Sequence, residues 1–309
     1  MRKKISILSA FSLMVIYVST TFATESAMGR YSVGLFSSPT VAVIPPEGAY
    51  WGVSTQHYSG KVNKSANVPT GEALQSSVDT SFYSVALIGV WVPEQDLSSL
   101  TRLTLGISVP LQFMETSGKL NKTQHTDQSG GIGDIMLAPT LGWKKGNHNI
   151  STSLKVFFPT GEYDKKSIAN IGMNYWTISP TISYTYFNVE SGVDLSASIG
   201  VDINSRNNDT NYTSGAMSHI DVSLIQNFSS SFGAGVFVSA LYQIQDDNGF
   251  MTDELNGFKG RAYSVGPIAR YTIKFDEYSF NIVGSWSPEV ETKNRVKGNN
   301  YYLTVNGGF

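Results

Sequence analysis

The sequence predicts an all-β protein, a single antiparallel transmembrane β-barrel of about 12 strands. Three observations predict it: a secretory leader, no long apolar run after that leader, and many segments in which apolar and polar side chains alternate. A membrane-spanning helix needs roughly 18 consecutive apolar residues, whereas a tilted barrel strand needs about 9–11. Because lipid offers no partners to backbone polar groups, only helices and closed barrels cross a bilayer.

Composition excludes several classes of function. The chain has 309 residues, no cysteine and a formal net charge of −2, so disulfides and thiolate metal sites are excluded. No strongly basic face is visible, which argues against a nucleic-acid partner. Glycine (29), tyrosine (16) and phenylalanine (16) are abundant, as is typical of barrels with bends and interfacial aromatic residues. We therefore expect no cofactor and no metal ion.

The N-terminus has the three parts of a secretory signal peptide. Residues 2–4 are basic, residues 5–18 are mainly apolar, and Thr21-Phe22-Ala23 supplies small residues for a cleavage site. We predict cleavage after Ala23, and an uncleaved membrane anchor is the alternative. The predicted divisions are a signal peptide (1–23), a periplasmic leader or short plug in the lumen (24–47), and an outer-membrane β-barrel (48–309).

Alternation over long segments favours a membrane barrel over a soluble β-sandwich. Between residues 176 and 186, even positions are apolar or aromatic and odd positions carry hydroxyl groups. Comparable alternation covers 103–113, 193–203 and 232–244. Sandwich strands are usually about five or six residues long, so runs of this length suit tilted strands with one face toward lipid.

Twelve segments show this pattern, and the lengths of their connections alternate between short and long. Short turns and long outer loops are typical of outer-membrane barrels, and an even strand count places both chain ends in the periplasm. The first long loop is expected to run from Ser59 to Thr80. The predicted strands are 49–58, 81–92, 101–114, 132–144, 148–158, 173–187, 191–204, 214–228, 232–246, 260–273, 277–289 and 300–309.

The chain ends on an aromatic residue in register with the last strand. Phe309 shares the parity of Tyr301, Leu303 and Val305, a pattern similar to the signal that barrel-assembly machinery reads. We expect the assembly machinery and outer-membrane lipid to be partners of a monomeric barrel in the cell outer membrane.

An ordered series of short motifs runs from residue 131 to the end of the chain. It includes Gly131-Ile132-Gly133-Asp134-Ile135, Phe158-Pro159-Thr160-Gly161-Glu162-Tyr163, Gly172-Met173-Asn174-Tyr175-Trp176-Thr177 and His219-Ile220-Asp221. The series resembles the transporter-like outer-membrane family named for the meta-pathway of phenol degradation. The resemblance implies an outer-membrane channel for aromatic or other hydrophobic small solutes. No energy-coupling or nucleotide site is visible in the sequence, so we expect passive uptake.

Polar residues of these motifs share the parity that faces away from lipid, so we expect them in the lumen. They would form an outer vestibule of mixed charge that selects solutes. The alternative is a hydrogen-bonded network that fills and rigidifies a small barrel. The candidate lumen residues are Asp134, Lys155, Asn174, Tyr175, Asp202, Asn204, Ser214, His219, Asp221, Gln243 and Arg270.

A hydrolase and a structural or adhesive barrel are the alternatives to a channel. Ser214, His219 and Asp221 suggest a hydrolase, since a triad needs a nucleophile, a base and an orienting group in hydrogen-bond sequence. These side chains are predicted to face inward, away from bilayer lipids, so no enzymatic activity is expected. A structural or adhesive barrel ranks second, because the predicted outer loops are modest and polar. Inward aromatic residues such as Phe157 and Phe237 are candidates for a path that guides an aromatic solute.

Overall fold

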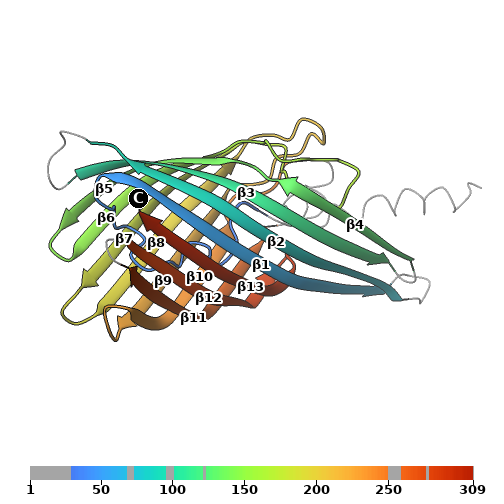
Figure 1. Ribbon diagram of the computed structural model, residues 1–309. Coiled ribbons are helices and arrows are strands. Elements are labelled where there is room, and N and C mark those ends of the chain that lie inside the picture. The colour runs from blue at the N-terminus through green and yellow to red at the C-terminus, as the bar shows by residue number, and fades with distance from the viewer. Residues whose placement is uncertain are drawn as a thin grey trace, which may run out of the picture.

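The structure, a computed structural model, describes residues 29–67, 73–94, 101–120, 123–249, 259–275 and 278–308. The predicted signal peptide and Phe309 lie outside the described residues. The described chain forms one antiparallel sheet that closes on itself (Figure 1). Its strands are β1 (Gly48–Asn67), β2 (Ala73–Val92), β3 (Thr101–Leu120), β4 (Thr123–Ile132), β5 (Met136–Lys145), β6 (His148–Phe157), β7 (Thr177–Asn188), β8 (Val193–Asn204), β9 (Met217–Asn227), β10 (Phe232–Gln243), β11 (Arg261–Phe275), β12 (Tyr278–Lys293) and β13 (Lys297–Gly308).

The thirteen strands occupy twelve positions in the ring. Strand β3 pairs with β4 through residues 111–120 and with β5 through residues 101–108. Strands β4 and β5 therefore lie end to end beside β3. Together they form one position in the ring, interrupted at residues 133–135. The ring closes because β1 pairs with β13 and β2 pairs with β3. The predicted antiparallel barrel of twelve strands is confirmed.

Alternation determines which side chains face lipid. In β7, Thr177, Thr181 and Thr185 are buried, whereas the intervening Ile178 and Ile182 are 46% and 58% exposed. The wall thus presents apolar groups outward and hydroxyl groups inward, the reverse of a soluble protein. A polar interior and an apolar outer band are what an outer-membrane barrel requires, and the protein lies in the outer membrane. No helix among the described residues is long and apolar enough to cross a membrane.

The outer face also carries tryptophan side chains. Trp91, Trp143, Trp176 and Trp286 are each between 40% and 54% exposed on the lipid side. Indole rings prefer the membrane–water interface, where the apolar ring meets lipid and the N–H meets water. The four side chains therefore fit the interfacial bands of a barrel.

The first three strands are longer than the sequence predicted, and they project beyond the neighbouring strands (Figure 1). Strand β1 pairs with β2 along its whole length, from Gly48↔Val92 to Asn67↔Ala73. The predicted loop from Ser59 to Thr80 is therefore wrong. Above the membrane both faces of a strand meet water, so apolar alternation fades while backbone pairing continues.

Candidate functional site in the barrel lumen

The lumen of the barrel contains residues 29–47, which we call the lumenal segment. Tyr31, Val33 and Ala42 are each 1% exposed, because barrel side chains surround them. The segment forms neither helix nor strand, so its backbone groups need other partners. Lumen-facing side chains supply several of these partners along its length.

The outer end of the lumenal segment is fixed by Arg30. Its guanidinium group forms an ion pair with Asp134, and the two side chains are 6% and 2% exposed. The same group donates to the Tyr175 carbonyl (2.7 Å) and to Thr177 Oγ1 (3.1 Å). It also lies 5.3 Å from the ring centre of Phe157 and 5.2 Å from that of Tyr175. Arg30 is thus paired, hydrogen-bonded and packed between aromatic rings, which offsets the cost of burying its charge.

Asp134 also holds the outer loop that joins β6 to β7. Its carboxylate accepts hydrogen bonds from the backbone N–H of Gly161 (2.7 Å) and of Met173 (2.9 Å). Asp134 itself lies in the interruption between β4 and β5. One carboxylate therefore joins the lumenal segment, the outer loop and the break in the barrel wall.

Asp221 anchors the middle of the lumenal segment. Its carboxylate accepts hydrogen bonds from the hydroxyl groups of Tyr31 (2.8 Å) and Ser37 (2.9 Å). A third hydroxyl, that of Ser239, donates to it from the neighbouring strand (2.7 Å). The Tyr31 ring stacks on the imidazole of His219, with centres 4.3 Å apart and planes 10° apart. Residues from β9 and β10 therefore hold the lumenal segment through both hydrogen bonds and ring stacking.

The periplasmic end of the lumenal segment has its own anchors. The backbone N–H of Thr40 donates to Asp194 (3.0 Å), and that of Ala42 donates to Thr185 Oγ1 (3.1 Å). Ser196 donates to the other oxygen of Asp194 (2.7 Å). The segment is consequently held at three levels, by Asp134, Asp221 and Asp194.

Lys155 and Asp202 complete the centre of the site. The Lys155 ammonium group donates to Thr181 Oγ1 (2.8 Å) and lies 3.9 Å from the ring centre of Phe36 in the lumenal segment. Asp202 lies 3.6 Å from His219 Nε2, beyond hydrogen-bond distance. Among the residues that the structure describes, neither imidazole nitrogen of His219 has a hydrogen-bond partner. His219 is therefore not arranged as the base of a triad with Ser214 and Asp221.

The remaining candidates at the outer end belong to loops as much as to strands. Ser214 and Asn174 precede β9 and β7, so their predicted places within strands are wrong. Asn174 has a left-handed backbone (φ 55°) and donates to Asn207 Oδ1 (2.9 Å). Asn204 accepts from Thr177 (2.8 Å) and donates to the Ser214 carbonyl (3.2 Å). These hydrogen bonds join neighbouring outer loops above the lumen.

Arg270 is separated from the other candidates. Arg270 of β11 pairs with Val283 of β12 near the periplasmic turn. Its guanidinium carbon lies 6.0 Å from the ring centre of Phe187. The predicted grouping of Arg270 in an outer vestibule is therefore wrong. Strand parity indicates the face of the wall on which a side chain lies but not its height in the barrel.

Asp247 is a site residue that is absent from the candidates predicted from the sequence. It is 4% exposed, and it accepts hydrogen bonds from Gly215 N–H (2.6 Å) and the Gln243 amide (2.6 Å). Burial raises its pKa to about 6, although hydrogen bonds from Tyr212, Gly215 and Gln243 oppose the rise. Its contacts join the β8–β9 loop to the β10–β11 loop over the lumen.

We predict that this loop junction loses stability as pH rises from about 4 to 6. A carboxyl whose pKa is raised in the folded state binds more protons there than in the unfolded chain, so stability falls as pH rises between the two values. The loss is about 1–3 kcal/mol. Amide-exchange protection of Gly215, corrected for intrinsic rates, will measure it. Asp247→Asn should abolish the pH dependence, and an unchanged dependence in that variant would contradict the assignment.

The lipid-facing wall and the occupied polar lumen together define an outer-membrane β-barrel. A family model described as "Putative MetA-pathway of phenol degradation" matches residues 62–305, which is most of the chain. The protein belongs to this family, as the ordered motifs suggested. No curated protein matches the sequence.

Solved structures share the fold at low sequence identity. The COG4313 outer membrane channel from Pseudomonas putida F1 is 13% identical, with a TM-score of 0.60 over 91% of this chain and 100% of that one. A Pseudomonas aeruginosa FadL homologue is 8% identical, with a TM-score of 0.43 over 84% of this chain and 89% of that one. The first of these likenesses shows that the barrel architecture is shared with an outer-membrane channel.

Proposed function

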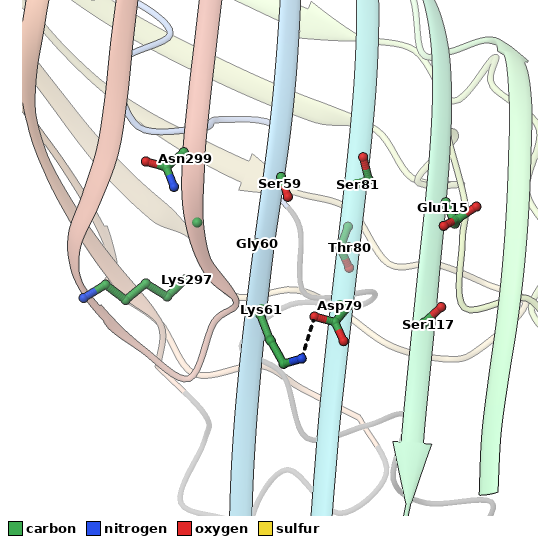
Figure 2. Close-up of a pocket in the computed structure, with 11 residues that line it drawn as sticks. Ser59, Gly60, Lys61, Asp79, Thr80, Ser81, Glu115, Ser117, Lys297 and Asn299 are labelled. Atoms are coloured by element: carbon green, nitrogen blue, oxygen red, sulfur yellow. Dashed lines mark ion pairs between the residues drawn. The ribbon is translucent and has the colours of Figure 1, made fainter.

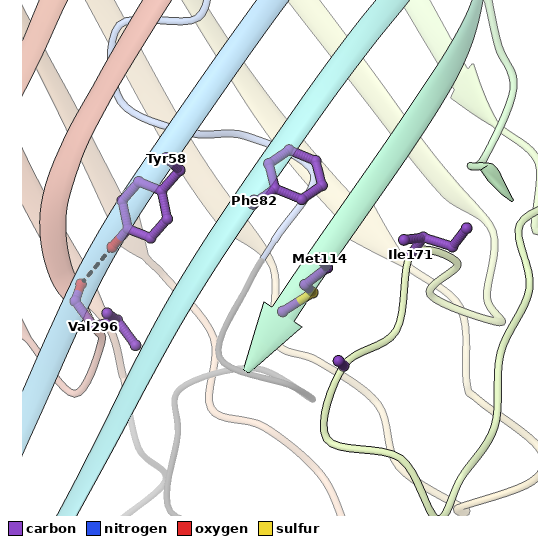
Figure 3. Close-up of a cluster of buried hydrophobic side chains, with 6 residues drawn as sticks. Tyr58, Phe82, Met114, Ile171 and Val296 are labelled. Carbon is purple, nitrogen blue, oxygen red and sulfur yellow. Dashed lines mark hydrogen bonds between the residues drawn. The ribbon is translucent and has the colours of Figure 1, made fainter. Parts of the chain in front are cut away.

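We propose that the protein is a channel for passive uptake of small hydrophobic or aromatic solutes and has no catalytic activity. The observation that carries the proposal is an apolar cluster at the outer end of the lumen (Figure 3), which is separate from the apolar cluster around Tyr31 and Val33 of the lumenal segment. Lumen side chains confer selectivity through their chemistry, so an apolar cluster there favours an apolar solute. The cluster consists of Tyr58, Phe82, Met114, Ala169, Ile171 and Val296.

Three separate parts of the chain build this cluster. Tyr58, Phe82 and Met114 point inward from β1, β2 and β3, as Figure 3 shows. Ile171 reaches them from the β6–β7 loop, and Val296 from the turn between β12 and β13. Because a loop supplies one side of the cluster, a solute could replace the loop's contacts without disturbing the barrel wall.

The wall beside this cluster is held by a loop as well as by strands. Among the described strands, β4 pairs with β3 alone. Its residue Asp127 accepts hydrogen bonds from Ile168 N–H (2.9 Å) and Ser167 Oγ (3.2 Å) of the β6–β7 loop. Movement of this loop would uncover the apolar cluster and the free edge of β4 together. This arrangement supports a route for apolar solutes through the wall. The lumenal segment would block the passage of large hydrophilic solutes through the lumen.

A structural barrel without transport is the second candidate. In that case the apolar cluster would only fill space. A polar substitution within it would not change the rate of solute uptake. No described residue forms a hydrogen bond with the His219 imidazole, which argues against a hydrolase, because a general base needs its nucleophile within hydrogen-bond reach.

Uptake of an aromatic solute into proteoliposomes will test the proposal, with ion conductance measured in parallel. We expect measurable uptake of phenolic or fatty solutes, low conductance, and about fivefold slower uptake in Ile171→Ser, which places a polar group in the cluster. Ile168→Ser on the same loop, outside the cluster, is the matched control. Folded protein that shows neither uptake nor any effect of Ile171→Ser would favour the structural barrel.

A further inference from the structure

A row of aromatic side chains marks the outer membrane–water boundary on one part of the wall. On the lipid face, strand register aligns Tyr301, His57, Tyr83 and Phe113 across β13, β1, β2 and β3. The His57 ring stacks on Tyr83 with centres 4.2 Å apart and on Tyr301 with centres 6.0 Å apart. Such rows lie at the headgroup level of the bilayer.

Two polar rows follow directly above this aromatic row on the same outward face. Two residues farther from the membrane, the register aligns Asn299, Ser59, Ser81 and Glu115. Another two residues farther, it aligns Lys297, Lys61, Asp79 and Ser117. At about 3.3 Å per residue, the rows lie roughly 7 and 13 Å along the strands from the rings. That is the zone of lipid headgroups and their attached sugars.

These two rows line a cavity of about 310 Å³ on the outside of the barrel (Figure 2). Lys61 pairs with Asp79 at 3.2 Å, and the two side chains remain 54% and 49% exposed. The Trp286 indole N–H donates to Asn299 Oδ1 (3.0 Å), which joins the aromatic level to the cavity. The cavity therefore offers ammonium, hydroxyl, amide and carboxylate groups together, within reach of the outer leaflet.

We propose that this cavity binds the phosphorylated sugar headgroup of an outer-leaflet glycolipid of the lipopolysaccharide type. The ammonium group of Lys61 matches phosphate, and that of Lys297, which donates to the Val290 carbonyl (2.7 Å), adds a second positive charge at the edge of the cavity. Ser59, Ser81 and Asn299 match sugar hydroxyls, and Asp79 can accept hydrogen bonds from those hydroxyls. The cavity is continuous with the lipid-facing wall and lies outside the lumen, so the site is independent of the channel proposed above.

The choice of a lipid rather than a soluble sugar rests on the aromatic row. A ligand in the cavity has its membrane-proximal end beside His57 and Tyr83, where acyl chains begin. A free sugar phosphate has no apolar part that would contact this aromatic edge. The headgroup of a glycolipid fills the polar rows while its chains continue along the apolar wall.

Binding of fluorescent lipopolysaccharide to the detergent-purified full barrel will test the site. The double variant Lys61→Ala/Lys297→Ala is expected to bind about five- to thirtyfold more weakly, because each lysine near an anionic surface contributes roughly a fivefold effect. The matched control is Lys144→Ala/Lys145→Ala, which removes two exposed lysines at the periplasmic end of β5. Equal weakening by both double variants would overturn the site.

Two further measurements test where the ligand binds and to which chemical class it belongs. Ser81→Tyr fills the cavity without a change of charge, and it should also weaken binding; full binding by this variant would overturn a cavity site. Phosphatidylglycerol vesicles and inorganic phosphate serve as competitors. Little competition by either supports a glycolipid headgroup, whereas competition as strong as that of unlabelled lipopolysaccharide would overturn it.

Discussion

Replacement of Asp134 by alanine is expected to lower the free energy of unfolding of the barrel by about 3–5 kcal/mol. The change leaves the Arg30 guanidinium buried without its counter-charge, and burial of an unpaired charge is far more costly than burial of a pair. It also removes the acceptor of two backbone N–H groups in the β6–β7 loop. The lumenal segment and the outer loop should therefore both loosen.

Urea titration of the refolded barrel, followed by tryptophan fluorescence, will measure this loss. The double variant Arg30→Met/Asp134→Leu is the informative control, because replacement of a whole buried pair by apolar groups is often neutral. We expect it to recover much of the stability lost in Asp134→Ala. A loss below about 1 kcal/mol in the single variant would place the pair among weak surface ion pairs.

The barrel wall could be predicted from sequence because strand parity is a local property. Ile178 and Thr177 differ by one position and lie on opposite faces of one strand, so their chemistry alone indicates lipid and lumen. The order of the strands in the ring then follows, because consecutive strands along the chain pair with each other. This is why ring size and inward-facing candidates such as Asp202 and Gln243 could be predicted from the sequence.

The contacts within the lumen could not be predicted in the same way. Arg30 meets Asp134 across 104 positions of sequence, and Tyr31 meets Asp221 across 190. The lumenal segment has no periodicity, so nothing local indicates which of its side chains face which strand. Arg30 and Tyr31 were missed for this reason. Asp194 could have been found, because it is a charged residue at a lumen-facing position. Its partner Thr40, however, lies in the lumenal segment and could not be predicted.

Deletion of residues 29–45 is expected to raise single-channel conductance by about tenfold or more, because a ring of this size leaves a narrow lumen that one ordered segment can block. Asp221→Ala should give a smaller rise, since it removes one of the three anchoring levels and leaves Asp134 and Asp194 in place. Planar-bilayer recordings of refolded protein will measure both changes. Ser54→Ala is the matched control, because it breaks a wall hydrogen bond to Thr304 (2.9 Å) outside the lumenal segment.

The deletion also locates the barrier to polar solutes. An ion path that opens on deletion places that barrier in the lumenal segment, and apolar solutes then need either its displacement or the route beside β4. A deletion variant that is folded and still closed would contradict the prediction. The barrier would then lie at the outer end, where Ile171 and the apolar cluster meet the β6–β7 loop. In that case Ile171→Ser should change conductance in the deletion background, whereas it should have little effect if the lumenal segment alone closes the pore.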